Sequence, residues 1–456
     1  MNKYSIKIYN FLDKHLKNIK PTKQDMTETN IYNQISELIK RTYSDINNYT
    51  YKISTIQIPK LHQPNTHPML YTLFQILNKY DLIKDLDCDT SNFTNYINWH
   101  REFYCSLDIK NLQQLIIKSN IPELLTLYNI IYNPDKLRLN LHSLYTNPFV
   151  SLDILQFIET VDLIQTIYIS DIYELTIYHQ NNQNIQDIID LNKILHILVC
   201  IYKLNKDNPD KLHNAKIIVS LILCNQKKYL PRIKQSILCS DNVNSGSTLS
   251  GSHITIWRQE EIYKVLIHEL IHFYELDFNS NYNNLNNIID LYCKKLYNIS
   301  GKNHDNEAFT EIMANIINCC LVSYYTKKDV NKIFNIEVLF SLFQAYKLFT
   351  YFGYDTRNID WHIQFKQNTS VFSYYIIKCA LLYNISDFIK LFEDSIYFTR
   401  QTNKPSDIIE KELIILIKSS MDKLKDLIIL NHKQLQHSIE TSNGFICNTM
   451  RMTCFG

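Results

Sequence analysis

The run Val265–Leu266–Ile267–His268–Glu269–Leu270–Ile271–His272–Phe273 contains the pattern H-E-x-x-H among apolar residues. On an α-helix, residues four apart lie one turn apart on the same face, so His268 and His272 can direct two imidazoles at one metal ion. Glu269 lies about 100° further round the helix, where it can reach a water molecule without binding the metal. Two neutral nitrogen ligands and a carboxylate base are the arrangement that zinc-dependent hydrolysis needs.

The residues around the two histidines favour a buried and rigid helix. All are apolar, and none is Pro or Gly. The alternative is an ordinary core helix in which both histidines are only hydrogen-bonded and Glu269 faces water, because so short a motif also arises by chance. A catalytic zinc usually has three protein ligands and one water, so a third ligand elsewhere in the chain separates the two interpretations.

Two acidic residues, Glu307 and Glu311, provide candidates for that ligand. They are four apart, so Glu307 can bind the metal while Glu311 accepts a hydrogen bond from a ligating imidazole and fixes its tautomer. The surrounding residues are apolar, and carboxylates buried among them would need a cation as partner. Alternatively, both face water on an amphipathic helix. His304 is a competing third ligand, ranked below Glu307 because it precedes the expected helix and lacks a paired carboxylate.

The combination of H-E-x-x-H with a later helix bearing Glu-x-x-x-acid resembles the gluzincin metallopeptidases. Asn306–Thr310, with the sequence NEAFT, is similar to the N-E-x-F-A segment of zinc aminopeptidases, and thermolysin-like enzymes have Glu-x-x-x-Asp there. The resemblance covers about residues 250–320. It implies one Zn²⁺ ion held by His268, His272 and Glu307, with Glu269 as general base and Glu311 supporting a ligand.

Other families of zinc peptidases fit less well. The metzincin pattern H-E-x-x-H-x-x-G-x-x-H needs Gly and His where this chain has Glu275 and Phe278. The chain also departs from the gluzincin pattern in one respect, because the spacer between His272 and Glu307 is longer than in thermolysin-like enzymes and zinc aminopeptidases. No G-A-M-E-N-type motif of exopeptidases precedes the helix, so endopeptidase and exopeptidase action both stay open.

A short strand before the motif is a candidate for binding an extended peptide. It follows a Gly/Ser-rich loop, alternates like a half-buried strand and leads directly into the motif helix. Main-chain groups of Ile254, Thr255 and Ile256 would pair with the substrate by strand addition if this strand lies at the edge of a sheet. An ordinary hairpin strand is the alternative.

The oxyanion formed during peptide hydrolysis needs a further hydrogen-bond donor. In gluzincins this donor is usually a Tyr, His or Arg from later in the chain. We favour Tyr354, beside Arg357 and His362, because Gly353 interrupts a helical region there and turns a side chain towards a cleft. The chain contains 32 tyrosines, so an ordinary packing role for Tyr354 is the alternative.

Composition limits the classes of partner and compartment. A net charge of +2 gives no indication of binding to nucleic acid or to an anionic membrane. The 11 cysteines are odd in number and show no C-x-x-C spacing, which favours reduced thiols in the cytoplasm or another reducing intracellular compartment. No signal peptide or transmembrane segment is expected, because the N-terminal residues are interrupted by charges and every apolar run is short. The partner implied by the resemblance to metallopeptidases is a peptide or protein substrate.

The periodicity predicts a mainly α (α+β) fold, with a zincin-like catalytic core and a small mixed sheet between large helical regions. We divide the chain into an N-terminal helical region (1–206), the catalytic core (207–328) and a C-terminal helical region (329–456). Helices are expected over Leu152–Ile167, Ile185–Leu204, Val330–Tyr351, Ser370–Phe392 and Ser406–Glu440, and strands over Ala215–Cys224 and His253–Trp257.

The sequence therefore predicts a zinc metallopeptidase. Zinc would lower the pKa of a bound water and polarise the scissile carbonyl, while Glu269 moves the proton from the water to the leaving amine. One alternative is a catalytically inactive scaffold or interaction protein of zincin fold, against which the intact Glu269 argues. The other is a zinc hydrolase that acts on another amide or an ester.

Overall fold

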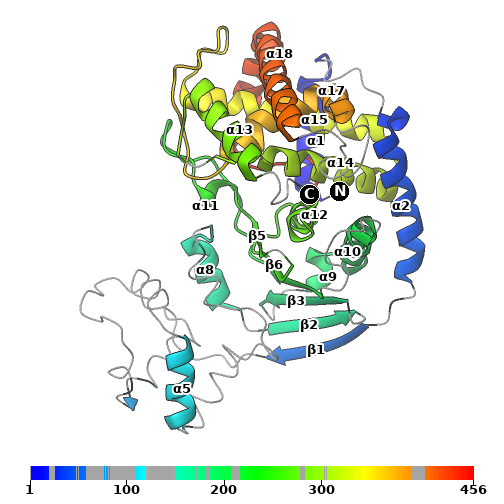
Figure 1. Cartoon of the computed structure of the whole chain (residues 1–456), viewed down its shortest axis with the longest axis vertical. Helices are drawn as coiled ribbons and strands as arrows, with labels where there is room; N and C mark the ends of the chain where they lie inside the picture. Colours follow the sequence, from blue (N-terminus) through cyan, green and yellow to red (C-terminus); the bar gives the residue numbers. More distant parts are fainter. Residues whose placement is uncertain are drawn as a thin grey trace.

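The described residues form a mainly helical structure with a six-stranded mixed β-sheet (Figure 1). A separate two-stranded parallel sheet pairs β7 (Ile299–Ser300) with β8 (Phe365–Lys366). The computed structural model describes residues 2–19, 26–57 except 48 and 50, 77, 79, 80, 82, 109–119, 121, 147–206 except 148, 162, 170, 171 and 181–183, 216–249, 251–277, 283–391 except 302 and 305, and 406–456. The mainly α class with a mixed sheet, expected from the sequence, is confirmed.

Six strands of the described residues form the main sheet, in the order β1-β2-β3-β4-β6-β5. Parallel pairing joins β3 to β4 and β4 to β6, and antiparallel pairing joins the strands at both sides of the sheet. The strands are β1 (Tyr51–Gln57), β2 (Leu163–Ile169), β3 (Tyr173–His179), β4 (Ile217–Ile222), β5 (Gly246–Leu249) and β6 (His253–Ile256).

The central strands β3 and β4 are buried, as expected for parallel strands covered on both faces. Every residue of β3 is buried, and β4 consists of Ile, Val, Leu and one Ser. The expected strand Ala215–Cys224 is confirmed as β4, and His253–Trp257 is confirmed as β6.

Three strands lie in the region that was expected to be helical. The helix expected over Leu152–Ile167 ends at Glu159 as α8 (Leu152–Glu159), and β2 begins four residues later. The sequence Leu163–Ile169 contains three Ile and one Thr, whose branched side chains pack well on a pleated surface. Since β3 pairs with β4, the sheet also crosses the expected domain boundary at residue 206.

The helices gather mainly on one side of the sheet, and α12 lies between them and the strands (Figure 1). α12 (Ile262–Phe273) carries the H-E-x-x-H motif and contacts β5, β6, α10 and α14. The other helices named in the text or in Figure 1 are α1 (Lys3–His15), α2 (Asn30–Ile46), α5 (Ile109–Ser119), α9 (Ile185–Ile188), α10 (Leu191–Lys206), α11 (Ser240–Val243), α13 (Asn283–Leu296), α14 (Asn306–Thr326), α15 (Val330–Phe352), α16 (Lys378–Tyr383), α17 (Ile385–Leu391) and α18 (Ser406–Thr441).

The long C-terminal helices follow the expected ranges within a few residues, as α15 and α18. The expected helix Ser370–Phe392 is divided into a π-helical turn, Ser373–Ile377, and the short helices α16 and α17. Within the described ranges, no helix is both long enough and apolar enough to cross a lipid bilayer.

Candidate metal centre

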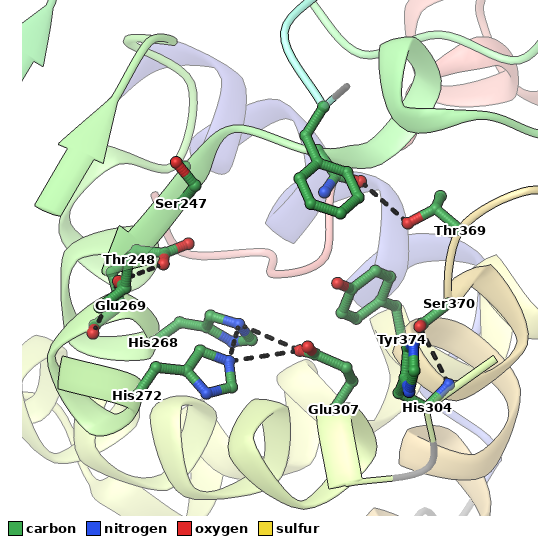
Figure 2. Close-up of a pocket in the computed structure, with 13 residues that line it drawn as sticks. Ser247, Thr248, His268, Glu269, His272, His304, Glu307, Thr369, Ser370 and Tyr374 are labelled. Carbon is green, nitrogen blue, oxygen red and sulfur yellow. Dashed lines mark hydrogen bonds and ion pairs between the residues drawn. The ribbon is translucent and has the colours of Figure 1, made fainter. Parts of the chain in front are cut away.

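The histidines of α12 meet the first turn of α14 at one point (Figure 2). The Nε2 atoms of His268 and His272 are 3.0 Å apart, and they lie 3.3 and 3.4 Å from Oε2 of Glu307. The candidate ligand atoms of these three residues all lie within 4.8 Å of one another. The structure thus brings together the three residues that the sequence predicts as zinc ligands.

Each imidazole faces a carboxylate on its outer side. His268 Nδ1 lies 2.9 Å from Oε1 of Glu311, and His272 Nδ1 lies 2.6 Å from Oδ2 of Asp277. A carboxylate accepts the Nδ1 proton, which leaves the Nε2 lone pair of each ring pointing inward. Two nitrogen lone pairs and a carboxylate oxygen then converge. These electron-rich atoms repel one another unless a cation or a proton lies among them. The donor set fits a divalent zinc ion.

The electrostatics of the cluster favour positive charge at the two imidazoles. Burial opposes protonation of His268, but hydrogen bonds to Glu307 and Glu311 outweigh burial and raise its pKa. Burial is likewise outweighed at His272, where Asp277 and Glu307 raise the pKa well above its ordinary value. Burial alone would raise the pKa of Glu307, but the two imidazoles hold it well below the usual range.

We expect zinc affinity to fall as the pH is lowered, starting above the ordinary pKa of histidine. Zinc needs both imidazoles neutral, and the neighbouring carboxylates raise the pKa of both, so protons compete from a higher pH than usual. Each competing proton should weaken binding about tenfold per pH unit. Competition with a chromophoric chelator between about pH 8 and pH 6, corrected for the chelator's own protonation, measures this change. Zinc affinity that is constant over that range would contradict it.

His304, the competing third ligand, lies at the rim of the same cavity and is not part of the cluster. Its side chain is 61% exposed, and Nδ1 is 3.3 Å from Oδ2 of Asp290. The hydrogen bond to Asp290 raises the pKa of His304 despite partial burial. The geometry therefore favours Glu307 over His304 as the third ligand.

Glu269 lies beside the cluster and is held by β5. Thr248 Oγ1 donates a hydrogen bond of 2.6 Å to Oε2 of Glu269 and contacts its main-chain oxygen at 3.0 Å. The backbone of β5 passes so close that a Cβ atom at Gly246 would lie 2.7 Å from Oε1 of Glu269. Gly246 therefore leaves the space that the Glu269 carboxylate occupies, because any side chain at position 246 would collide with it.

A cavity of about 410 Å³ opens over these residues (Figure 2). Its lining combines the three candidate ligands and Glu269 with mostly polar residues and the rings of a Phe and a Tyr: Phe149, Asn244, Gly246, Ser247, Thr248, His304, Thr369, Ser370 and Tyr374. A volume of this size admits a short peptide segment or another small ligand.

The strand that borders this cavity is β5, which corrects the expected substrate strand. Ile254, Thr255 and Ile256 belong to β6, which pairs with β4 on one side and β5 on the other. Their main-chain groups are therefore occupied within the sheet. Among the described strands, β5 is the last in the order, and three of its residues line the cavity. The sequence does not reveal this, because edge position depends on strand order.

Tyr354 lies outside the cavity, so the expected oxyanion donor is also corrected. Tyr354 is buried, and its hydroxyl donates to the main-chain oxygen of Ile363 at 2.6 Å. Tyr374 lines the cavity instead, with its hydroxyl pointing inward (Figure 2). It belongs to the π-helical turn Ser373–Ile377, a local irregularity that often marks functional sites. Burial, together with the nearby carboxylates, raises the pKa of Tyr374 well above its ordinary value, so the hydroxyl remains a proton donor.

Four supporting residues were not predicted: Asp277, Thr248, Tyr374 and Lys264. Lys264 has a local signal, since it lies one turn before His268 on the same helix face, and its ammonium group pairs with Glu311. Asp277 follows α12 closely, but nothing in the sequence shows that the chain turns back there. Thr248 and Tyr374 reach the site only through the sheet and the helical packing.

Comparisons with protein-family models, with curated proteins and with solved structures find no match to this chain. The function is therefore inferred from the geometry of the cluster and its cavity.

Proposed function

We propose that this chain is a zinc-dependent metallopeptidase with a zincin-like core. The observation that carries the proposal is the convergence of His268, His272 and Glu307, with Glu269 beside them in one cavity. A zinc ion held by the three residues would supply a Lewis acid that lowers the pKa of water and polarises a carbonyl. The proposed core comprises the sheet, α12 and α14.

Glu269 has the position of a general base. Its side chain is buried, and Thr248 fixes one carboxylate oxygen. We propose that Glu269 accepts the proton of the attacking water and then donates that proton to the leaving amine. The second partner of each imidazole, Glu311 or Asp277, holds the ring in the tautomer that leaves Nε2 free.

An extended peptide is the substrate that this cavity fits best. β5 has a partner strand on one side only in the described sheet, and its residues Gly246–Thr248 line the cavity. A peptide that pairs with β5 would pass over Glu269 and the candidate ligands, so that its main chain supplies affinity without a demand on sequence. Peptide-bond hydrolysis is thus favoured over hydrolysis of a small ester.

We expect Tyr374→Phe to lower kcat for peptide cleavage by about 10²–10³-fold, with little change in KM or in zinc content. The reason is that Tyr374 points into the cavity as a proton donor and would hydrogen-bond the oxyanion, which forms only during the reaction. Steady-state kinetics measure the change. Tyr354→Phe is the matched control, because it removes a buried tyrosine hydroxyl outside the cavity. A loss of kcat as large in Tyr354→Phe would contradict the role given to Tyr374.

The proposal is tested by incubating the zinc-loaded protein with a defined mixture of peptides and identifying the products by mass spectrometry. Cleavage that stops with a zinc chelator and returns with added zinc is the expected result. Bound zinc with cleavage only of esters or of other amides would favour the alternative, a zinc hydrolase that acts on one of those bonds. Bound zinc with no hydrolysis of any of these would favour a scaffold.

A further inference from the structure

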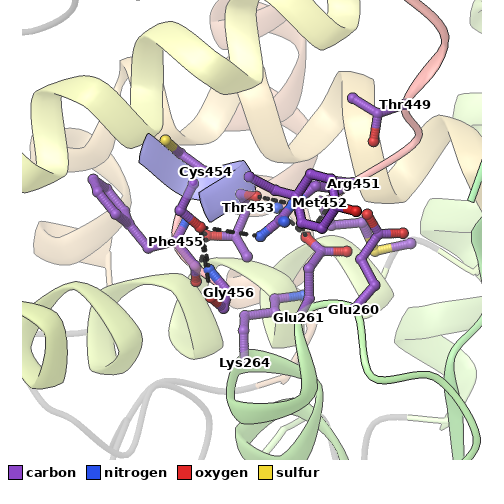
Figure 3. Close-up of polar contacts among 12 residues, drawn as sticks. Glu260, Glu261, Lys264, Thr449, Arg451, Met452, Thr453, Cys454, Phe455 and Gly456 are labelled. Atoms are coloured by element: carbon purple, nitrogen blue, oxygen red, sulfur yellow. Dashed lines mark hydrogen bonds and ion pairs between the residues drawn. The ribbon is translucent and has the colours of Figure 1, made fainter. Parts of the chain in front are cut away.

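The segment Thr449–Gly456 lies inside the protein, beside Glu261 and Lys264 at the start of the helix that carries the motif (Figure 3). Residues 449–455 are all buried, although the segment forms no regular helix or strand. A buried irregular segment needs partners for its main-chain polar groups. The side chains that supply these partners indicate the role of the segment.

Side chains bind the main-chain oxygens of this segment. Lys378 Nζ donates to the oxygen of Met452 at 2.6 Å, and Lys347 Nζ donates to that of Thr449. Three further donors, Tyr375, Gln344 and Asn318, reach the oxygens of Met450, Arg451 and Phe455 at 2.5, 2.6 and 2.8 Å. The protein therefore holds residues 449–456 as it would hold a bound peptide.

Two buried carboxylates bind the main-chain amides. Glu261 Oε1 accepts from the amides of Met452 and Thr453 at 2.7 and 2.6 Å, and Glu337 Oε2 accepts from the amide of Cys454 at 2.9 Å. Glu261 immediately precedes α12 and has a left-handed backbone conformation, with φ of 61°. Such a conformation is costly for a residue with a side chain, so the contacts to the segment offset that cost. The segment thereby fixes the start of the helix that carries His268.

A second connection reaches the imidazole of His268 through Lys378 and Glu311. Lys378 Nζ, held by the Met452 oxygen, lies 3.8 Å from Oε2 of Glu311. Lys264 pairs with the other oxygen of Glu311, which also faces Nδ1 of His268 at 2.9 Å. Glu311 is 1% exposed and therefore depends on these two cations.

The side chain of Met452 adds a third contact. It lines a small cavity of about 40 Å³ together with His268, Glu269, Glu311 and Tyr374. The side chain of Met452 thus packs beside the metal centre, and its main-chain oxygen positions Lys378. Met450, two residues earlier, is also buried and does not line this cavity.

We propose that Met452 and Lys378 are positioning residues of the metal centre. The Met452 side chain packs beside His268 and Glu311. Its main-chain oxygen holds Lys378, which in turn positions Glu311 and, through Glu311, the His268 ring for metal binding. This inference rests on the proposed metal site. Met452 and Lys378 orient the His268 ligand, and neither residue contacts the metal or the substrate.

Two matched pairs of variants in the full chain test the inference. Lys378→Met and Met452→Ala are expected to weaken zinc binding by about 10–100-fold, the usual effect of losing an outer partner of a ligand. Lys347→Met removes another lysine that binds this segment, and Met450→Ala shortens another methionine within it. Both controls leave the contacts to Glu311 intact and should keep zinc affinity within about twofold. All four variants should lower the thermal stability, because each removes a buried contact. Chelator competition gives the zinc affinity.

Cobalt-substituted protein gives a second measurement that a loss of stability alone does not change. The visible absorption of bound Co²⁺ should shift in Lys378→Met and Met452→Ala and stay unchanged in the two controls. Equal effects within both pairs, or unchanged zinc affinity and spectra throughout, would overturn the inference. If Lys378→Met does not fold, the methionine pair decides alone. A wild-type protein that binds no zinc would instead overturn the metal site itself, and with it this inference.

Discussion

Replacing Glu269 by Gln is expected to lower kcat for peptide cleavage by about 10²–10⁴-fold while the protein keeps its bound zinc. The amide has nearly the shape of the carboxylate and can still accept a hydrogen bond from Thr248, but it takes no proton from water. Glu269 is not among the three converging ligands, so the metal should stay in place. Initial rates on a cleaved peptide, together with zinc content by atomic emission, measure both effects.

The control for this variant is Glu440→Gln, which makes the same chemical change at an exposed position on α18. It should retain full activity. Peptide cleavage by Glu269→Gln at the wild-type rate would remove Glu269 as the base. Loss of zinc in Glu269→Gln would show that Glu269 is itself a ligand, which the geometry of the cluster does not suggest.

Replacing Glu307 by Ala is expected to weaken zinc binding by more than the roughly 10–100-fold typical of an outer partner, because it removes one of three ligands. Activity should fall with the zinc content. The matched control is His304→Ala, since His304 lines the same cavity and pairs with Asp290 at its rim. It should keep zinc affinity within about twofold. Chelator competition on both purified variants measures the difference.

The reverse result, with zinc lost in His304→Ala and kept in Glu307→Ala, would make His304 the third ligand. The imidazole would then have to turn from Asp290 into the cavity. Because α14 is long and well packed, circular dichroism should show that both variants keep the wild-type helical content. That check separates a missing ligand from an unfolded protein.

The parts of the fold that could be predicted are those that depend on local sequence. α12, α14, α15 and α18 each show a long apolar pattern with helical period, and β4 and β6 are short and β-branched. The pairing of residues within one helix, such as His268 with His272, follows from the helical repeat. The same argument places Glu307 and Glu311 on one face of α14, and the structure directs both towards α12.

The parts that could not be predicted depend on contacts between distant segments. Strand order decides that β5, and not the strand with Ile254–Ile256, lies at the edge beside the cavity. Tyr354 and Tyr374 are both buried tyrosines near helix ends, and only the packing of α15 and the π-helical turn decides which one reaches the site. Likewise, no local pattern shows that residues 449–456 return to α12.

The central claim is that this chain binds one zinc ion through the H-E-x-x-H helix and α14. It is tested most directly by the anomalous scattering of zinc in crystals of the purified protein. The account predicts one ion, with Nε2 of His268, Nε2 of His272 and a carboxylate oxygen of Glu307 within about 2.0–2.3 Å of it. A zinc ion bound elsewhere, or a crystal grown with zinc in which these three residues bind none, would contradict the account.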